Sequence, residues 1–96
     1  MHGLTWPIHS AGLPHLIFLD LYNNRIERIQ GLDTVTGLRV LMLGKNRLSK
    51  IEGLGGLSRI DVLDLHSNRI EKIEQLDHLS ALRCVRIYWA MCASNM

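Results

Sequence analysis

One feature constrains this chain more than any other: a similar stretch of eight residues occurs three times at an interval of 22 residues. The copies are LDLYNNRI, LMLGKNRL and LDLHSNRI, and they begin at Leu19, Leu41 and Leu63. No insertion or deletion interrupts the period between residues 13 and 87. Self-similarity at a fixed period of about 20–50 residues is typical of proteins built from stacked repeats. We therefore expect a solenoid.

The alternating leucines of each copy indicate a short β-strand. Residues two apart point to the same side of a strand, so Leu19 and Leu21 face inward while Asp20 faces outward. Because every strand has the same phase in the period, the strands should pair in parallel, each repeat covering its neighbours' leucines. The apolar columns expected in the core are Leu13, Val35, Leu57, Leu79; Leu16, Leu38, Ile60, Leu82; Leu19, Leu41, Leu63, Val85; Leu21, Leu43, Leu65, Ile87; Ile26, Leu48, Ile70; Ile29, Ile51, Ile73; and Leu32, Leu54, Leu76.

The asparagine that follows each strand predicts a turn. Asn24, Asn46 and Asn68 are aligned by the period, and a short amide side chain hydrogen-bonds the backbone where a strand ends. Stacked copies should form a ladder in which each asparagine bridges neighbouring repeats.

The rest of each repeat must return the chain to the next strand. Ile26, Ile29 and Leu32 recur every third residue, which is the spacing of a 3₁₀-helix, although a loose turn fits as well. Glycines such as Gly53 argue against long helices there. A narrow strand side and a wider return side predict a curved stack with the strands on the concave face.

The pattern LxxLxLxxN resembles the leucine-rich repeat family, and the 22-residue unit LxxLxxLxLxxNxIxxIxxL resembles its short intracellular class. This resemblance implies an α/β leucine-rich-repeat solenoid, with parallel strands on the concave face and 3₁₀ or loop returns on the convex face. It covers residues 13–89 as three full repeats and a partial fourth. Residues 1–12 are then a divergent lead or cap, and residues 90–96 are a non-repeat tail.

The repeat pattern fails near the C-terminus. Ala90 stands where a fourth asparagine is due. Terminal repeats of a solenoid need a polar outer face to stay soluble, and none is visible in this sequence. We expect a fragment or short isoform of a longer repeat protein, with self-association through the uncapped C-terminal end.

Composition excludes several classes of function. The net charge is +2, from 11 basic and 9 acidic side chains, which does not favour a nucleic-acid partner or a membrane surface. No apolar run approaches the 18 or so residues of a membrane-spanning helix. Two cysteines are too few for a disulfide scaffold, so we expect a reduced, cytoplasmic protein.

The outward strand positions form the expected protein-binding surface. Phe18, Val40 and Val62 align as an apolar stripe, and an apolar centre flanked by charges suits a protein partner. The predicted protein-binding residues are Phe18, Asp20, Tyr22, Arg39, Val40, Met42, Asp61, Val62, Asp64, His66, Arg83 and Arg86. Alternatively, these groups only pair with one another across the sheet, each pair contributing roughly 0.2–1 kcal/mol.

Evidence for catalysis is weak. Asp64 and His66 are two residues apart on one face, a spacing that would suit a metal pair or a general base. No third ligand and no nucleophile accompanies them, and the stretch GLGGL at 53–57 lacks the strand–helix context of a phosphate loop. We predict no catalytic, cofactor-binding or metal site.

An arginine follows each turn asparagine, at Arg25, Arg47 and Arg69. This column of positive charge either binds an acidic ligand or is simply solvated.

The short intracellular class includes a phosphatase regulatory subunit, an axonemal dynein light chain and a spliceosomal protein. Within that class, the stretch from Pro14 to Ile70 resembles the leucine-rich-repeat subunits of tubulin polyglutamylase complexes. The resemblance implies a non-catalytic scaffold with polyglutamylase subunits or tubulin as partners, associated with the microtubule cytoskeleton. The alternatives are a regulatory subunit that binds a phosphatase or dynein-type partner, and a ribonucleoprotein adaptor.

Overall fold

The computed structural model describes residues 15–87 of the 96-residue chain. The expectations for the lead at 1–12, for Leu13, for Ala90 and for the tail at 90–96 lie outside the described residues, and so does the end of the partial fourth repeat.

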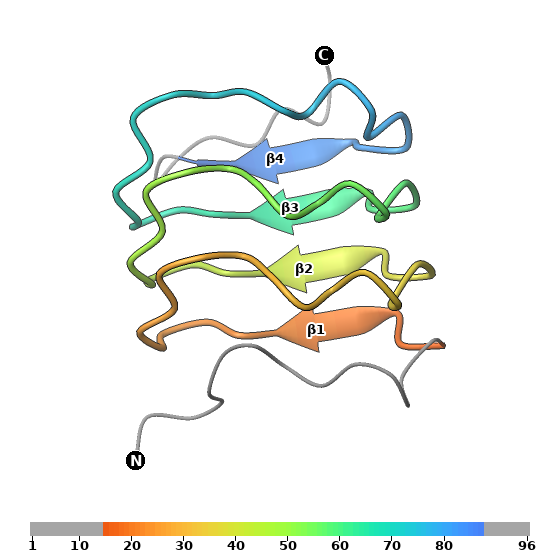
Figure 1. Ribbon diagram of the computed structural model, residues 1–96, viewed down its shortest axis with the longest axis horizontal. Helices are drawn as coiled ribbons and strands as arrows, with labels where there is room; N and C mark the ends of the chain where they lie inside the picture. Colours follow the sequence, from red (N-terminus) through yellow and green to blue (C-terminus); the bar gives the residue numbers. More distant parts are fainter. Residues whose placement is uncertain (1–14, 88–96) are drawn as a thin grey trace.

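The described residues form four parallel strands, one in each repeat. The strands are β1 (Phe18–Asp20), β2 (Val40–Met42), β3 (Val62–Asp64) and β4 (Cys84–Arg86). They make one sheet in the order β1-β2-β3-β4, with Leu19, Leu41, Leu63 and Val85 in register. Figure 1 shows the resulting coils stacked in chain order. The predicted parallel solenoid is confirmed.

The strands β1, β2 and β3 are each followed by a turn with a left-handed backbone residue. Asn23, Lys45 and Ser67 have φ values of 61°, 55° and 57°, and they are aligned by the 22-residue period. A strand requires negative φ, so this conformation marks the place where the chain leaves the sheet. The same turn after each of these three strands gives the three described turns the same shape.

The return segments are loops built from single turns, and no helix occurs between residues 15 and 87. In the first return, the amide of Val35 donates to the Leu32 carbonyl (3.2 Å) and that of Leu38 to the Val35 carbonyl (3.0 Å). The same i-to-i+3 bonds join residues 54, 57 and 60, and then residues 76, 79 and 82. Of the two forms expected for the returns, the loop is the one observed. The 3₁₀-type hydrogen bonds of the first return begin at Leu32. Leu32 is the last residue of the every-third-residue series Ile26, Ile29 and Leu32, so these bonds follow that series and do not lie within it.

The core is the set of aligned apolar columns between the sheet and the returns. Its buried members are Leu21, Ile26, Ile29, Leu32, Val35, Leu38, Leu41, Leu43, Leu48, Ile51, Leu54, Leu57, Ile60, Leu63, Leu65, Leu79, Val85 and Ile87. One predicted core residue differs: Ile73 is 49% exposed, whereas its column partners Ile29 and Ile51 are 2% and 0% exposed. Each of those partners is covered by the following coil, and the described residues include no further return to cover Ile73.

The asparagine ladder bridges neighbouring coils as expected. Asn46 donates to the carbonyls of Leu21, Leu43 and Gly44, at 3.0, 3.0 and 3.2 Å. Its Oδ1 accepts from the amides of Asn24 (3.2 Å) and Ile26 (3.1 Å) in the preceding coil. Asn68 repeats this arrangement one coil further on, donating to Leu43 O and accepting from the amide of Leu48. The ladder satisfies backbone groups that the turn would otherwise leave unpaired.

Nothing in the part of the chain that the structure describes is both helical and apolar over a length that would cross a membrane.

Candidate functional site

The solvent-facing side of the four strands, together with the residue just after each strand, is called the outer sheet face here. The predicted protein-binding residues lie on it in four columns. From β1 towards β4 the columns are Ile17, Arg39, Asp61, Arg83; then Phe18, Val40, Val62, Cys84; then Asp20, Met42, Asp64, Arg86; and then Tyr22, Gly44, His66.

The apolar column has its most exposed member at the β1 edge. Phe18 is 56% exposed and its neighbour Ile17 is 57% exposed, whereas Val40 and Val62 are half-buried. The register places Phe18 beside Val40, and Val40 beside Val62, so the expected apolar stripe is continuous. Cys84 ends the column in β4 and is disulfide-bonded, which differs from the expected reduced thiol.

The charged column contains one ion pair among the described residues. The guanidinium of Arg39 donates to the Asp61 carboxylate at 3.0 Å, with side-chain exposures of 59% and 16%. Arg83, the third member of the predicted ladder, is exposed and has no ion pair within the described range. An exposed pair of this kind contributes between 0 and about 1 kcal/mol, so much of the charge remains available to a partner.

Two carboxylates on the outer sheet face close the turn after their own strand. The Asp20 side chain accepts from the amide of Tyr22 at 3.0 Å, and that of Asp64 accepts from the amide of His66 at 3.2 Å. Asp64 Oδ1 also lies 2.6 Å from His66 Nδ1. Met42 aligns with both carboxylates and cannot make this bond. Asp20 and Asp64 therefore have a structural role besides any contact with a partner.

Gly44 provides the space in which two rings meet. The ring centroids of Tyr22 and His66 are 5.8 Å apart, from the coils on either side of Gly44. A Cβ atom at Gly44 would lie 2.6 Å from His66 Cε1 and 3.1 Å from Tyr22 Cδ1. The glycine at position 44 therefore allows the His66 imidazole to pack directly against the backbone of β2's coil.

The expectation that Asp64 and His66 face solvent is wrong. Their relative exposures are 3% and 4%, so neither is available as a contact surface in this structure. The imidazole of His66 occupies the space that the missing side chain of Gly44 leaves. The carboxylate of Asp64 is buried beside it, with Oδ1 2.6 Å from His66 Nδ1. Asp20 and Tyr22, the same positions two coils earlier, are exposed.

Lys45 is a surface residue that the sequence did not single out. Its Nζ lies 5.7 Å from the centroid of the Tyr22 ring, a distance typical of a cation–π contact. Lys45 also has a left-handed backbone and donates its amide to the His66 carbonyl at 2.9 Å. The aligned positions are Asn23 and Ser67, so the period gave no signal for a cation here.

No group of three or more His, Cys, Asp or Glu side chains within residues 15–87 is arranged to hold a metal ion. The Asp64–His66 pair is too deeply buried to meet a substrate in this structure.

Comparison with known proteins agrees with this architecture. A family model described as Leucine Rich repeats (2 copies) matches residues 14–56 and again residues 36–80, which together make more than half of the chain. No curated protein matches the chain significantly.

Two solved structures of Listeria monocytogenes proteins are similar to this chain. Internalin C2 and an internalin (inlF) each have 29% sequence identity to it, with a TM-score of 0.74. Each match covers 81% of this chain, but only 34% of internalin C2 and 23% of the other internalin. The chain thus spans about a third or less of the proteins it resembles. With its period, its parallel strands and the family match in agreement, this chain belongs to the leucine-rich repeat family.

Proposed function

We propose that this chain is a non-catalytic protein-interaction module that binds a protein partner through its outer sheet face. The observation that carries the proposal is the continuous apolar column from Phe18 to Val62, exposed most at Phe18 and flanked by the Arg39–Asp61 pair. Interface centres combine buried aromatic anchors with arginine, and a charged rim surrounds them.

The proposed contact set differs from the set expected from sequence because of burial. It consists of Phe18, Asp20, Tyr22, Arg39, Val40, Met42, Asp61, Val62, Arg83 and Arg86. Asp64 and His66 are left out because they are buried beneath this surface.

A narrower proposal concerns the identity of the partner. Resemblance of the sequence to leucine-rich-repeat subunits of tubulin polyglutamylase complexes supports a scaffold role in a tubulin-modifying complex, in the cytoplasm and on microtubules. The alternatives are a phosphatase or dynein-type partner and a ribonucleoprotein.

Capture of binding proteins by the full chain, followed by mass spectrometry, tests both levels of the proposal. We expect tubulin or tubulin-modifying subunits to be enriched by the wild type and at least about tenfold less by Phe18→Ala, because loss of an interface anchor costs about 2 kcal/mol or more. Arg59→Ala is the control, since Arg59 is an exposed residue that lies outside the outer sheet face.

Two results would contradict the proposal in different ways. Enrichment of phosphatase, dynein or splicing proteins through Phe18 would replace the tubulin-modifying complex and keep the interaction surface. Equal capture by wild type and Phe18→Ala would remove the outer sheet face as the binding site.

Self-association at the C-terminal end is a second proposed contact. Ile73 is a large apolar side chain with half of its surface exposed at the last described coil, and we propose it as the contact with a second copy. Sedimentation velocity should show a concentration-dependent rise in mass for the wild type and not for Ile73→Glu. A wild type that remains monomeric at all concentrations would remove the proposal.

A further inference from the structure

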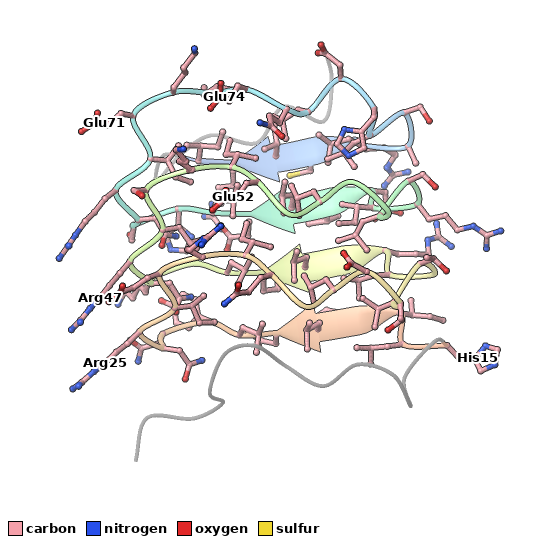
Figure 2. The ribbon with its side chains drawn as sticks, in the orientation of Figure 1. His15, Arg25, Arg47, Glu52, Glu71 and Glu74 are labelled. Atoms are coloured by element: carbon pink, nitrogen blue, oxygen red, sulfur yellow. The ribbon has the colours of Figure 1, made fainter. Side chains whose placement is uncertain are left out.

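The three arginines that follow the turn asparagines form a column on one edge of the stack. Arg25, Arg47 and Arg69 are all exposed. The backbone amides of Arg47 and Arg69 donate to Ile26 O (2.9 Å) and Leu48 O (2.8 Å) of the preceding coil, which fixes their positions in the stack. Figure 2 shows Arg25 and Arg47 extending from successive coils to the same side, away from the core.

The guanidinium groups of this column are not neutralised by other described side chains. The ion pairs found in residues 15–87 involve Arg28 with Glu52, Arg39 with Asp61, and Lys72 with Glu74, and the His66 ring lies within hydrogen-bond distance of Asp64. None of them includes a member of the arginine column. An arginine remains charged at any physiological pH, so the column is a permanent line of positive charge.

A hollow lies against two members of the column. It has a volume of about 380 Å³ and is lined by Glu27, Arg28, Arg47, Ser49 and Arg69. Three arginines and one glutamate give this lining a formal charge of +2. Arg28 is already engaged by Glu52 at 3.2 Å, which leaves Arg47 and Arg69 as the available cations.

Ser49 removes a competing charge from the middle of this edge. The aligned positions in the coils before and after are Glu27 and Glu71. A glutamate at position 49 would offer the neighbouring guanidiniums a carboxylate of their own, whereas a serine hydroxyl donates a hydrogen bond to an incoming anion. Of the three aligned positions, only Ser49 is a neutral donor, and Glu27 is the one carboxylate in the lining of the hollow.

The chemistry of the hollow selects oxyanions. Neighbouring coils of a parallel sheet are about 4.8 Å apart, so two arginines on adjacent coils are able to reach the same carboxylate or phosphate. The planar guanidinium bonds such groups with two parallel N–H donors. Arg25 extends the line by one more coil, which suits a ligand that carries several anionic groups in sequence.

We propose that the arginine column binds an acidic peptide segment of a protein partner, with one carboxylate or phosphate seated between Arg47 and Arg69 beside Ser49. The segment runs in extended form along the stack, so that a second anionic group meets Arg25. A peptide fits better than a nucleic acid, because Phe18 and Tyr22, the phenylalanine and tyrosine of the described residues, belong to the outer sheet face and offer no stacking platform here. This site is separate from the outer sheet face and does not require that face to bind.

Fluorescence anisotropy with labelled peptides and the full chain tests the proposal. The probes are a glutamate-rich peptide, a phosphoserine peptide of the same length, and a control peptide with glutamine at each acidic position. We expect one or both anionic peptides to bind with an affinity that falls as salt is added, and the glutamine peptide not to bind. Which anionic peptide binds more tightly distinguishes carboxylate from phosphate as the natural group.

Variants locate the site. Arg47→Gln with Arg69→Gln should weaken binding at least about tenfold, since each removes a charge-assisted hydrogen bond to the anion. Arg59→Gln is the matched control, being an exposed arginine outside the column, and should bind as the wild type does. Ser49→Glu should also weaken binding, because it restores the competing carboxylate.

Three outcomes would overturn the proposal. These are binding of neither anionic peptide, an equal loss in the Arg59→Gln control, and tighter binding of a single-stranded oligonucleotide than of either peptide. Phe18→Ala separates this site from the proposed interaction surface. The variant should bind acidic peptides normally even if it loses the partner captured by the outer sheet face.

Discussion

The turn asparagines show how much a single side chain contributes in a repeat protein. Asn46 is 7% exposed and makes five hydrogen bonds to backbone groups in its own coil and the preceding one. An amide has two donors and one acceptor oxygen with two lone pairs, so this side chain uses its capacity fully. The aligned Asn24 donates to Leu21 O and Tyr22 O, both in its own coil.

We therefore predict that Asn46→Ala lowers the free energy of unfolding by about 2–4 kcal/mol, because buried backbone groups lose their partners. Asn24→Ala is the matched control and should cost about 1 kcal/mol, since its two bonds lie in a more exposed turn. Urea denaturation followed by circular dichroism measures both values. Equal losses in the two variants would show that bridging between coils adds nothing to the ladder.

Side chains on the outer sheet face were harder to predict than the ladder. The positions of the turn asparagines follow from the 22-residue period, and so does their role of hydrogen-bonding the backbone of neighbouring coils. The burial of Asp64 and His66 depends instead on Gly44 and Tyr22, which lie one and two coils away. A pattern of outward positions assigns the same exposure to each repeat, and it therefore cannot detect a ring that fills a neighbour's missing side chain.

One coil of this stack consists of a strand of three residues, a turn and a loop return. The second left-handed position of the coil lies in the return, where Gly31, Gly53 and Gln75 have φ values of 78°, 74° and 62°. At Gly53 an added Cβ would lie 2.2 Å from the Ile29 carbonyl oxygen of the preceding coil. Glycine is needed there both for its backbone conformation and for the close approach of two coils.

Gly53→Ala should destabilise the protein by about 2 kcal/mol or more, because it combines left-handed strain with a clash against backbone. Gly55→Ala in the same loop is the control: nothing lies within 4 Å of its added Cβ, and its φ is not positive. Its stability should stay within about 0.5 kcal/mol of the wild type. Thermal denaturation of the two variants compares them, and similar melting temperatures would contradict this account of Gly53.

Stacking makes the stability of the molecule depend on position along the axis. Each repeat contacts only its neighbours, so a residue covered on both sides contributes more than the same residue at the last described coil. Ile51 and Ile73 occupy the same position in successive coils with exposures of 0% and 49%. The period alone would assign them the same role.

Ile51→Ala should lower the free energy of unfolding by about 2–5 kcal/mol, the usual cost of emptying a buried isoleucine site. Ile73→Ala should cost less than about 1 kcal/mol, because its side chain already meets solvent over half of its surface. Chemical denaturation gives both values. A loss at Ile73 as large as that at Ile51 would mean that further chain covers it.

Residue spacing alone was enough to predict the repeat, the phase of the strands, their parallel pairing, the turn asparagines and nearly all of the core. These features follow from spacing because alternation along a strand and stacking at a fixed period are properties of the backbone. The remaining features required the tertiary structure, because they arise between residues of different coils. The imidazole over Gly44, the exposure of Ile73, and the unpaired Arg47 and Arg69 beside Ser49 all depend on contacts between repeats whose outward residues differ.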